Sequence, residues 1–341
     1  MLSDNKIRVL VVDDSILFRE VLSKGISADP EVEVVATAND PFDARDKIIE
    51  YKPDVMTCDV EMPKMNGIEF IRRLIPQYPL PVIVVSSVNG AVFDAIKAGA
   101  VDFVAKPDVN SVDSVKSFVT EMIEKVKIAS MAKVMPLKKE NRTGRIGSNY
   151  KDGSKRIIAI GASTGGTEAI SSIIKELPEN TPGIVLVQHI PPVFSRMFAE
   201  RLNSFSALNV KEAATGDLIK AGQVLVAPGD KHMKIVKIGD NYKVQCFKGE
   251  KVNGHCPSVD ILFESAAKEA GSNSIGVILT GMGYDGAKGL LSMRKAGART
   301  IGQDEQSCVV YGMPKVAFNI GAVEKQAPLS DIARIIYRFL A

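Results

Sequence analysis

The sequence contains no tryptophan, only three histidines and only four cysteines in 341 residues. The cysteines are far apart and never form a C-x-x-C pair, so neither a zinc site nor a disulfide framework is indicated. No apolar run reaches the roughly 18 residues that a membrane span needs. The amino terminus also lacks the apolar core and cleavage site of a signal peptide. We therefore expect a cytoplasmic protein with reduced thiols and no membrane insertion.

A strong excess of charge of either sign is also missing. Lysine and arginine number 43 against 40 aspartates and glutamates, which leaves a formal net charge of +3. Such a small excess does not argue for a nucleic-acid partner. The hydrophobic content of 45% is that of a globular protein, and the length accommodates two domains of about 100–200 residues.

The first half of the chain alternates short apolar runs with amphipathic stretches from Lys6 to about Lys127. Five runs read as buried strands: IRVLVVDD, VEVVATAND, VMTCDVEMP, PVIVVSS and VDFVAKP. The segments between them carry apolar residues at helical spacing. Strands that alternate with helices predict a parallel sheet covered on both faces. We expect residues 1–127 to form this α/β domain.

A polar, basic stretch separates this domain from a second one. Residues 128–155 have few large apolar side chains and several Gly, Ser, Asn and Lys, which predicts a solvated linker. Residues 156–341 contain RIIAIGAS, GIVLVQH and SIGVILTGMG, apolar runs that are typical of central parallel strands. Period-two stretches around Gly239-Asp240-Asn241 predict a β-hairpin. The second domain should be a doubly wound, mostly parallel α/β domain with an appended β-hairpin.

Polar side chains stand at the ends of the predicted strands in the first domain. Asp13 and Asp14 end the first strand and Asp59 ends the third. Parallel strands converge at their carboxyl ends, and crowded carboxylates repel each other unless a hard cation such as Mg²⁺ binds them. Ser86 and Lys106 end the fourth and fifth strands, where a hydroxyl and an ammonium could hold a phosphoryl group. This pattern predicts a phosphate-accepting carboxylate.

The segments VLVVDDS, CDVEMPKMNG, VVSS and VAKP resemble the response-regulator receiver domain, over about Lys6 to Ala129. The resemblance implies a flavodoxin-like fold, with Mg²⁺ as cofactor and a chemotaxis histidine kinase as phosphodonor. It implies that Asp59 is the phosphoacceptor and that Asp13, Asp14, Asp59 and the backbone carbonyl of Glu61 form the metal site. It also implies that Ser86 is the switch hydroxyl, Lys106 the phosphate-binding ammonium and Phe103 the switch aromatic. Packing explains Phe103 equally well, and the neighbouring Cys58 is expected to be a packed small hydrophobe.

A glycine-rich turn opens the second domain. Gly161-Ala162-Ser163-Thr164-Gly165-Gly166 lies between a predicted strand and the helix TEAISSIIKEL. G-x-S-x-G in this context exposes a nucleophilic serine, and N–H groups at the helix start could stabilise an oxyanion. Thr167-Glu168 replaces the Lys-Ser/Thr of a phosphate-binding loop, and Ala162-Ser163 breaks a dinucleotide fingerprint. For this motif alone, a plain glycine-rich turn remains the alternative to a serine nucleophile.

The three histidines divide into one candidate base and two others. His189 follows the run GIVLVQ, so it lies at the carboxyl end of a predicted strand. His232 falls in the predicted hairpin, and His255 in a turn before a helix that Ser258 is expected to cap. We expect His232 and His255 to be surface or capping residues, and changes at either to have mild effects.

Asp285 completes a candidate triad. It lies among glycines just beyond the run SIGVIL, where a structural turn aspartate is the favoured reading of the motif alone. Ser163, His189 and Asp285, however, each follow a different parallel strand at one edge of the sheet, where open α/β folds bind ligands. Their order in the chain differs from that of α/β-hydrolases, which predicts a different topology with the same chemistry.

The segments GASTGG, QHIPP, VNGHCPSVD, TGMGYDG and GMPKVA resemble the catalytic domain of the chemotaxis methylesterase (CheB) family, from about Arg156 onward. The resemblance implies hydrolysis of glutamate γ-methyl esters on chemoreceptor cytoplasmic helices, and it raises deamidation of receptor glutamines as a second activity. It implies Ser163 as nucleophile, His189 as base, Asp285 as its partner and the Met282 backbone N–H as oxyanion donor, with no cofactor for hydrolysis.

A receiver domain is compatible with two other functions. A DNA-binding response regulator would need a helix-turn-helix, which the second half lacks. A phosphorylation-controlled esterase for small-molecule esters is the remaining alternative. In either esterase, a receiver domain has a use only if its state alters access to Ser163, so we expect the receiver to inhibit the unphosphorylated enzyme.

Overall fold

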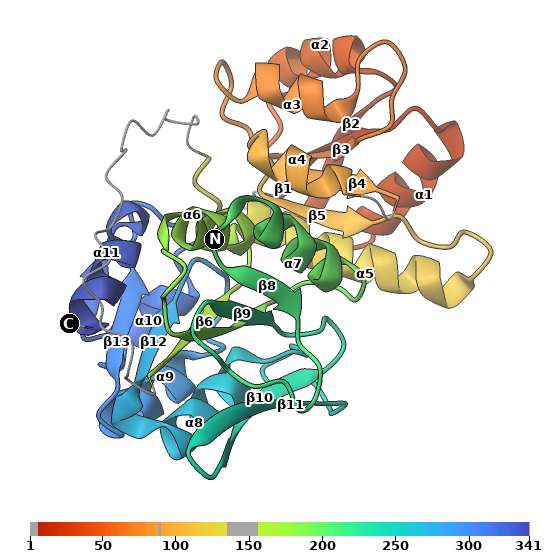
Figure 1. The fold of residues 1–341 in the computed structure, drawn as a ribbon. Helices are drawn as coiled ribbons and strands as arrows, with labels where there is room; N and C mark the ends of the chain where they lie inside the picture. The colour runs from red at the N-terminus through yellow and green to blue at the C-terminus, as the bar shows by residue number, and fades with distance from the viewer. Residues whose placement is uncertain (1–5, 88–89, 135–155, 341) are drawn as a thin grey trace. The chain divides into compact units, whose positions relative to one another are not determined.

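The computed structural model describes residues 6–87, 90–134 and 156–340. The chain divides into two compact units, Met1–Glu140 and Asn141–Ala341 (Figure 1). The predicted linker, residues 128–155, lies for the most part outside the described residues. Within them, no helix is both long enough and apolar enough to cross a membrane.

The first unit is a five-stranded sheet in the order β2-β1-β3-β4-β5, in which every pair of neighbours is parallel. This is the flavodoxin-like strand order, so the expected fold is confirmed. Its strands are β1 (Ile7–Val12), β2 (Val32–Ala38), β3 (Val55–Asp59), β4 (Val82–Ser86) and β5 (Asp102–Ala105). Its helices are α1 (Ile16–Ile26), α2 (Pro41–Tyr51), α3 (Gly67–Leu74), α4 (Ala91–Lys97) and α5 (Val112–Ala129).

Burial of the central strands and capping of the helices explain why these residues form the elements of this unit. All residues of β3 and β4 are buried, as expected of strands that helices cover on both faces. The first three helices begin at residues whose side chains accept backbone N–H groups, namely Ser15, Asp40 and Asn66. Gly67 lets α3 start against β3, because a Cβ there would lie 2.0 Å from the carbonyl oxygen of Asp59.

The second unit is a seven-stranded parallel sheet in the order β14-β13-β12-β6-β7-β9-β8. Its strands are β6 (Ile157–Ala162), β7 (Gly183–Gln188), β8 (Asn209–Glu212), β9 (Gln223–Val226), β12 (Ser274–Ile278), β13 (Arg299–Gln303) and β14 (Lys325–Ala327). Its helices are α6 (Gly166–Glu176), α7 (Phe194–Phe205), α8 (Val259–Glu269), α9 (Ala287–Lys295), α10 (Met313–Asn319) and α11 (Leu329–Leu340), with the short 3₁₀ helix η1 (Gly271–Asn273). The three apolar runs form β6, β7 and β12, which are the three central strands of this sheet, as predicted.

The predicted hairpin is present as β10 (His232–Ile238) and β11 (Asn241–Phe247), which pair antiparallel around Gly239 and Asp240. It forms a two-stranded sheet of its own, separate from the seven-stranded sheet. Its buried side chains join the hydrophobic core that α8 and the main sheet share: Met233, Ile235, Tyr242 and Val244. Apolar packing, together with backbone hydrogen bonds between residues 216–219 and β11, therefore attaches the hairpin to the second domain. In the part of the chain that the structure describes, no strand of the main sheet pairs with it.

Candidate functional site

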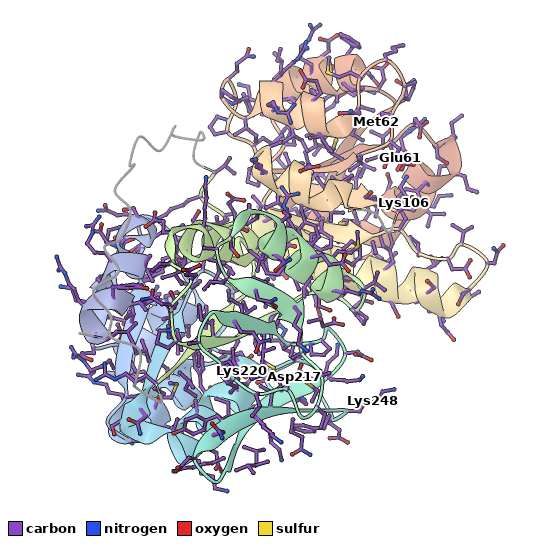
Figure 2. All side chains as sticks on the ribbon, viewed as in Figure 1. Glu61, Met62, Lys106, Asp217, Lys220 and Lys248 are labelled. Atoms are coloured by element: carbon purple, nitrogen blue, oxygen red, sulfur yellow. The ribbon has the colours of Figure 1, made fainter. Side chains whose placement is uncertain are left out.

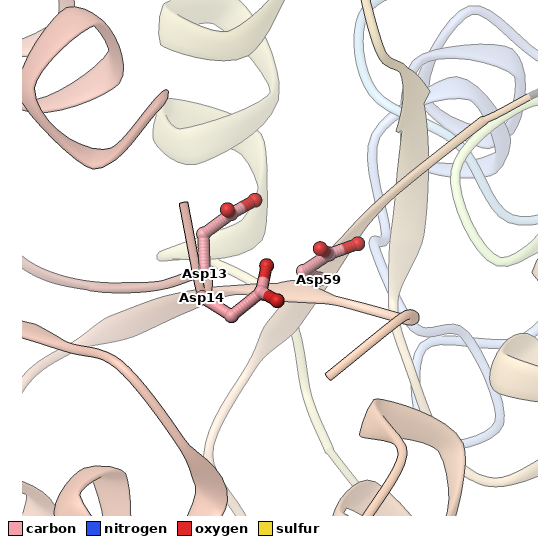
Figure 3. A group of neighbouring side chains, drawn as sticks. All are labelled: Asp13, Asp14 and Asp59. Atoms are coloured by element: carbon pink, nitrogen blue, oxygen red, sulfur yellow. The ribbon is translucent and has the colours of Figure 1, made fainter. Parts of the chain in front are cut away.

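Three carboxylates meet at the carboxyl ends of β1 and β3 in the first unit (Figure 3). Oxygen atoms of Asp13, Asp14 and Asp59 all lie within 4.8 Å of one another. Asp13 and Asp59 are buried and Asp14 is exposed, so the group opens to solvent on one side. Adjacent parallel strands bring these residues together, as the sequence predicts.

Lys106, which follows β5, neutralises part of this charge; it is labelled in Figure 2. Its ammonium donates a hydrogen bond to Oδ2 of Asp59 at 2.7 Å and makes an ion pair with Oδ2 of Asp13 at 3.1 Å. Burial alone would lower the pKa of Lys106, but these two carboxylates outweigh it and raise the pKa above its ordinary value. Lys106 therefore stays charged beside the expected phosphoacceptor.

Asp13 has an oxygen that suits a metal ion. Its Oδ1 accepts the N–H of Ser15 at 2.9 Å, whereas its buried Oδ2 accepts no hydrogen bond of good geometry. Burial, followed by the charge of Asp59, raises the pKa of Asp13 despite the opposing contacts of Ser15 and Lys106. A divalent cation would relieve this repulsion, and hard oxygen ligands are what Mg²⁺ prefers. The residues present therefore fit Mg²⁺.

The other predicted receiver residues lie on or directly after β3, β4 and β5. Ser86 is fully buried at the end of β4, where its carbonyl accepts the N–H of Lys106 at 2.8 Å. Glu61 donates its backbone N–H to Oδ1 of Asp59 at 3.2 Å. Phe103 is buried edge-on against Phe93, with ring centroids 6.1 Å apart, so in this conformation it is part of the core. Its role as a switch remains a prediction.

The adjacent Cys58 is fully buried, and burial raises the pKa of its thiol. A thiol that is protonated and shielded in this way is unreactive. The structure thus agrees with the expectation that Cys58 packs as a small hydrophobe.

In the second unit, β6 places Ser163 between the ends of its two neighbouring strands. Ala162 pairs with Gln188, so Ser163 and His189 each come one residue after a paired position. The N–H of His189 donates to the carbonyl of Ala162 at 3.1 Å, and the N–H of Ser163 donates to the carbonyl of Thr280 at 3.0 Å. Backbone pairing alone therefore brings the ends of β6, β7 and β12 together.

The turn after β6 differs from a strained nucleophile elbow. Its left-handed residue is Gly165, at φ +76°, directly before α6. Ser163 is not among the residues with positive φ in the described part of the chain, and its side chain is half-buried. The expected strand-to-helix turn is present, but the strain that G-x-S-x-G implies at the serine is carried by a glycine instead.

Gly281 brings the loop after β12 against this serine. A Cβ at Gly281 would lie 2.6 Å from the Cβ of Ser163 and 2.5 Å from the Sδ of Met313, so only glycine fits. The next residue is Met282, whose side chain is partly exposed. Among the described residues its backbone N–H donates to no protein group. The oxyanion role that the family resemblance implies for this N–H stays a prediction.

His189 and Asp285 are in direct contact. The Nε2 of His189 lies 2.9 Å from Oδ2 of Asp285, and both side chains are buried. An ionised carboxylate only accepts, so Nε2 carries a proton, and in the neutral imidazole Nδ1 then presents its lone pair. The buried Nδ1 has no hydrogen-bond partner, which means that the hydroxyl of Ser163 is not bonded to it in this conformation. Hydrogen bonds between nucleophile and base are often long in substrate-free sites.

The carboxylate of Asp285 receives hydrogen bonds from every side. Besides His189, its donors are Asn253 Nδ2 at 2.8 Å, Ser258 Oγ at 2.8 Å, and the N–H groups of Val259 at 2.7 Å and Asp260 at 3.2 Å. Burial alone would raise the pKa of Asp285, but the bonds from His189 and the other donors hold it well below its ordinary range. Asp285 is therefore ionised wherever the protein is folded at ordinary pH.

Two of these donors are backbone groups in the first turn of α8, so Asp285 caps this helix from outside. The expectation that Ser258 caps it is wrong. Ser258 occupies the N-cap position, but its hydroxyl donates to Asp285 and accepts no N–H of the helix. The positive end of α8 stabilises the carboxylate, which in turn supplies the missing cap.

The structure also corrects the expectation for the other two histidines. His232 is 1% exposed and lies in the core: its Nε2 bonds the carbonyl of Glu250 at 2.8 Å, and its Nδ1 accepts the N–H of Ser258 at 3.2 Å. The ring of His255 stacks on that of His189, with centroids 3.6 Å apart and planes 14° apart.

Asn253 and His255 are site residues that the sequence reasoning missed. The available signal was the Asn-Gly turn in the segment VNGHCPSVD, which has residues of distinctive chemistry on both sides of it. Nothing in that segment, however, indicates that it reaches the ends of β7 and β12.

Comparisons with known proteins find a matching family for each of the two units. The family model for the CheB methylesterase matches residues 158–336, and that for the response regulator receiver domain matches residues 9–114. A protein-glutamate methylesterase/protein-glutamine glutaminase 2 from Syntrophomonas wolfei is 58% identical over 98% of each chain. A protein-glutamate methylesterase/protein-glutamine glutaminase from Salmonella typhi is 46% identical over 97% of this chain and 96% of the relative.

Among solved structures, the CheB methylesterase catalytic domain of Thermotoga maritima matches with a TM-score of 0.53 and 40% identity. The match covers 54% of this chain and 97% of that domain. The methylesterase model spans more than half of the sequence, and full-length relatives share about half of their residues with it. This chain therefore belongs to the CheB methylesterase family, with a response regulator receiver domain ahead of its catalytic domain.

Proposed function

We propose that the chain is a phosphorylation-controlled protein-glutamate methylesterase that removes methyl groups from glutamate γ-methyl esters of chemoreceptors. The observation that carries this proposal is the buried His189–Asp285 pair, whose free Nδ1 lies at the strand end beside Ser163. A base with a fixed tautomer next to a serine is the arrangement that acyl transfer requires. The names of the full-length relatives supply the protein-glutamate methyl ester, and the resemblance to the chemotaxis family supplies the chemoreceptor that carries it.

In the first half of the reaction, the Oγ of Ser163 attacks the ester carbonyl while Nδ1 of His189 takes the serine proton. Asp285 stabilises the imidazolium that forms, and the Met282 N–H faces the oxyanion. When the carbon–oxygen bond to the methoxy group breaks, His189 returns the proton and methanol leaves. Water then attacks the acyl-enzyme by the same route, which releases glutamate and restores Ser163.

The same acyl-enzyme would form from a glutamine side chain. His189 would then protonate a departing ammonia in place of methanol, and every other step would be unchanged. The relatives' names pair methylesterase with protein-glutamine glutaminase. We therefore include deamidation of receptor glutamines in the proposed function.

The proposed partners follow from this chemistry. A methyl ester has little surface to recognise, so selectivity must come from docking of the receptor's cytoplasmic helix, which places the reaction in the cytoplasm. The phosphodonor is a chemotaxis histidine kinase. Asp13, Asp14 and Asp59 would hold Mg²⁺, with the carbonyl of Glu61 as a further ligand, and the ion would neutralise charge on the incoming phosphoryl group.

The direct test of the proposed function is methanol release from methylated receptor membranes, with and without acetyl phosphate and Mg²⁺. We expect release that phosphodonor and Mg²⁺ together accelerate. Hydrolysis of p-nitrophenyl acetate without methanol release from the receptor would instead support the small-molecule esterase.

Asp59→Asn should abolish phosphorylation, because an amide cannot form the acyl phosphate and Lys106 would lose one of its two charged partners. Intact-mass spectrometry after treatment with acetyl phosphate and Mg²⁺ should show one added phosphoryl group on the wild type and none on the variant. Methanol release by the variant should stay at the basal rate. Asp46→Asn, at an exposed aspartate on α2, is the matched control and should be labelled normally. A phosphoryl group on another residue of the wild type would refute the assignment of Asp59.

Removal of the receiver should activate the esterase without phosphodonor if the receiver inhibits by restricting access to Ser163. We expect a fragment beginning near Asn149 to release methanol about 5- to 150-fold faster than the unphosphorylated full chain, the range of ordinary coupling energies. Initial rates on the same receptor membranes measure this ratio. A fragment no faster than the full chain would show that phosphorylation acts by positive contacts from the receiver.

A further inference from the structure

The turn between β11 and α8 touches both members of the His189–Asp285 pair. It is a two-residue hairpin, in which Val252 and His255 exchange two backbone hydrogen bonds of 3.0 Å. Its central residues, Asn253 and Gly254, have φ of +53° and +83°, as this tight turn requires. This turn geometry therefore fixes the directions in which the side chains of Asn253 and His255 point.

Asn253 holds the carboxylate side of the pair. Its Nδ2 donates to Oδ1 of Asp285 at 2.8 Å and to Oδ2 of Asp260 at 2.8 Å. Asp260 in turn accepts the N–H of Gly289 at 2.7 Å, which ties the turn to α8 and α9. The turn is thus anchored on the side of the site that carries Asp285.

His255 holds the imidazole side. Its ring lies face to face with that of His189, at 3.6 Å between centroids and 14° between planes. The hydrogen bond from Nε2 to Asp285 fixes one edge of the His189 ring but allows rotation about the axis of that bond. A second ring stacked on its face removes this freedom. The free Nδ1 then has a single direction.

We propose that His255 is a positioning residue for His189: its ring sets the plane of the base, while Asn253 of the same turn fixes Asp285. This inference rests on the proposed function, because it assigns His189 as the base. Such a clamp suits a base that must meet a serine one strand away, since small misplacements of a catalytic group cost up to about 10²-fold in rate.

The clamp works only while His255 is uncharged. Burial, and then the neighbouring His189, lower the pKa of His255 to about 4; Lys251 acts in the same direction and Asp285 opposes it. At neutral pH the stacked ring therefore carries no proton, and it does not repel the imidazolium that forms on His189 during the reaction.

Two substitutions in the full-length protein separate the clamp from other roles of His255. His255→Phe keeps a flat ring without nitrogens, whereas His255→Ala removes the ring. We expect His255→Ala to lower kcat for methanol release by about 10- to 100-fold with little change in KM. His255→Phe should recover most of the loss. Glu250→Ala, at an exposed side chain of the same loop, is the control and should match the wild type.

NMR of ¹⁵N-histidine-labelled protein gives a readout that does not depend on esterase activity. Because Asp285 sets the tautomer, His189 should stay protonated at Nε2 in the wild type and in both variants. Its ring resonances should be sharp in the wild type and in His255→Phe, and broadened by exchange between ring orientations in His255→Ala. If thermal unfolding shows that His255→Ala does not fold, His255→Gln replaces it, because glutamine fills space without an aromatic face.

Three results would overturn the proposal. One is an alanine variant with normal kcat, and another is an alanine variant whose His189 ring resonances are as sharp as those of the wild type. The third is an equal loss of kcat in the alanine and phenylalanine variants, which would mean that the nitrogens of His255 move a proton themselves. Absence of methanol release from the wild type would refute the proposed function instead, and the line widths of the His189 ring resonances would still decide whether His255 acts as a clamp.

Discussion

Ser163→Ala should lower methyl-ester hydrolysis by at least about 10⁴-fold, because no other group at the site can form the acyl-enzyme. The substitution removes only the hydroxyl and keeps the Cβ that packs against Gly281, so we expect the fold to be unchanged. Initial rates of methanol release from methylated receptor membranes measure the effect, and thermal unfolding checks the fold.

Ser171→Ala is the matched control, because Ser171 lies in α6, and its hydroxyl donates only to the carbonyl of Thr167, at 2.7 Å. Its rate should equal that of the wild type. His189→Gln should be impaired about as strongly as Ser163→Ala, since the serine then has no base. Near-normal turnover of purified Ser163→Ala would show that the nucleophile lies elsewhere.

Asp285→Asn should lower kcat by about 10⁴-fold, the effect of the equivalent change in a serine protease triad. All the groups around this carboxylate donate hydrogen bonds, so the amide nitrogen of an asparagine would face a donor in either orientation. His189 would then be favoured in the other tautomer, with its proton on Nδ1, where it cannot accept the proton of Ser163. Initial rates and the ¹⁵N shifts of His189 should report both consequences.

Asp240→Asn, at the exposed hairpin turn, is the control for the change of aspartate to asparagine and should have no effect. Asp285→Asn should also lose stability, because α8 loses its charged cap and a buried set of donors loses its acceptor. An Asp285→Asn variant with wild-type kcat and an unchanged tautomer would show that Asp285 is structural only.

Periodicity accounts for how well the receiver site can be predicted. A strand of a parallel sheet ends where its apolar run ends, and all such ends lie at one edge. The positions of Asp13, Asp59 and Lys106 in the sequence therefore place them in the same small volume, and the structure has Lys106 within 3.1 Å of both carboxylates.

The second site was predictable only in part. Ser163 and His189 follow adjacent parallel strands, whose carboxyl ends lie at the same edge of the sheet, so their proximity could be predicted in the same way. Asp285 lies five residues beyond Thr280, in a loop whose path depends on where α8 begins. The sequence indicates that an aspartate follows β12, but it does not indicate that a helix start and an asparagine would surround it.

The sequence by itself determined the two α/β domains, the alternation of strands and helices in each of them, and the residues at the strand ends. These features follow from local periodicity. Tertiary structure alone decided that the hairpin forms its own sheet, that His232 is buried, and that Asn253 and His255 contact Asp285 and His189. These contacts join segments 32 and 66 residues apart in the chain. No local pattern reports them, because burial and stacking depend on which surfaces the packed core brings together.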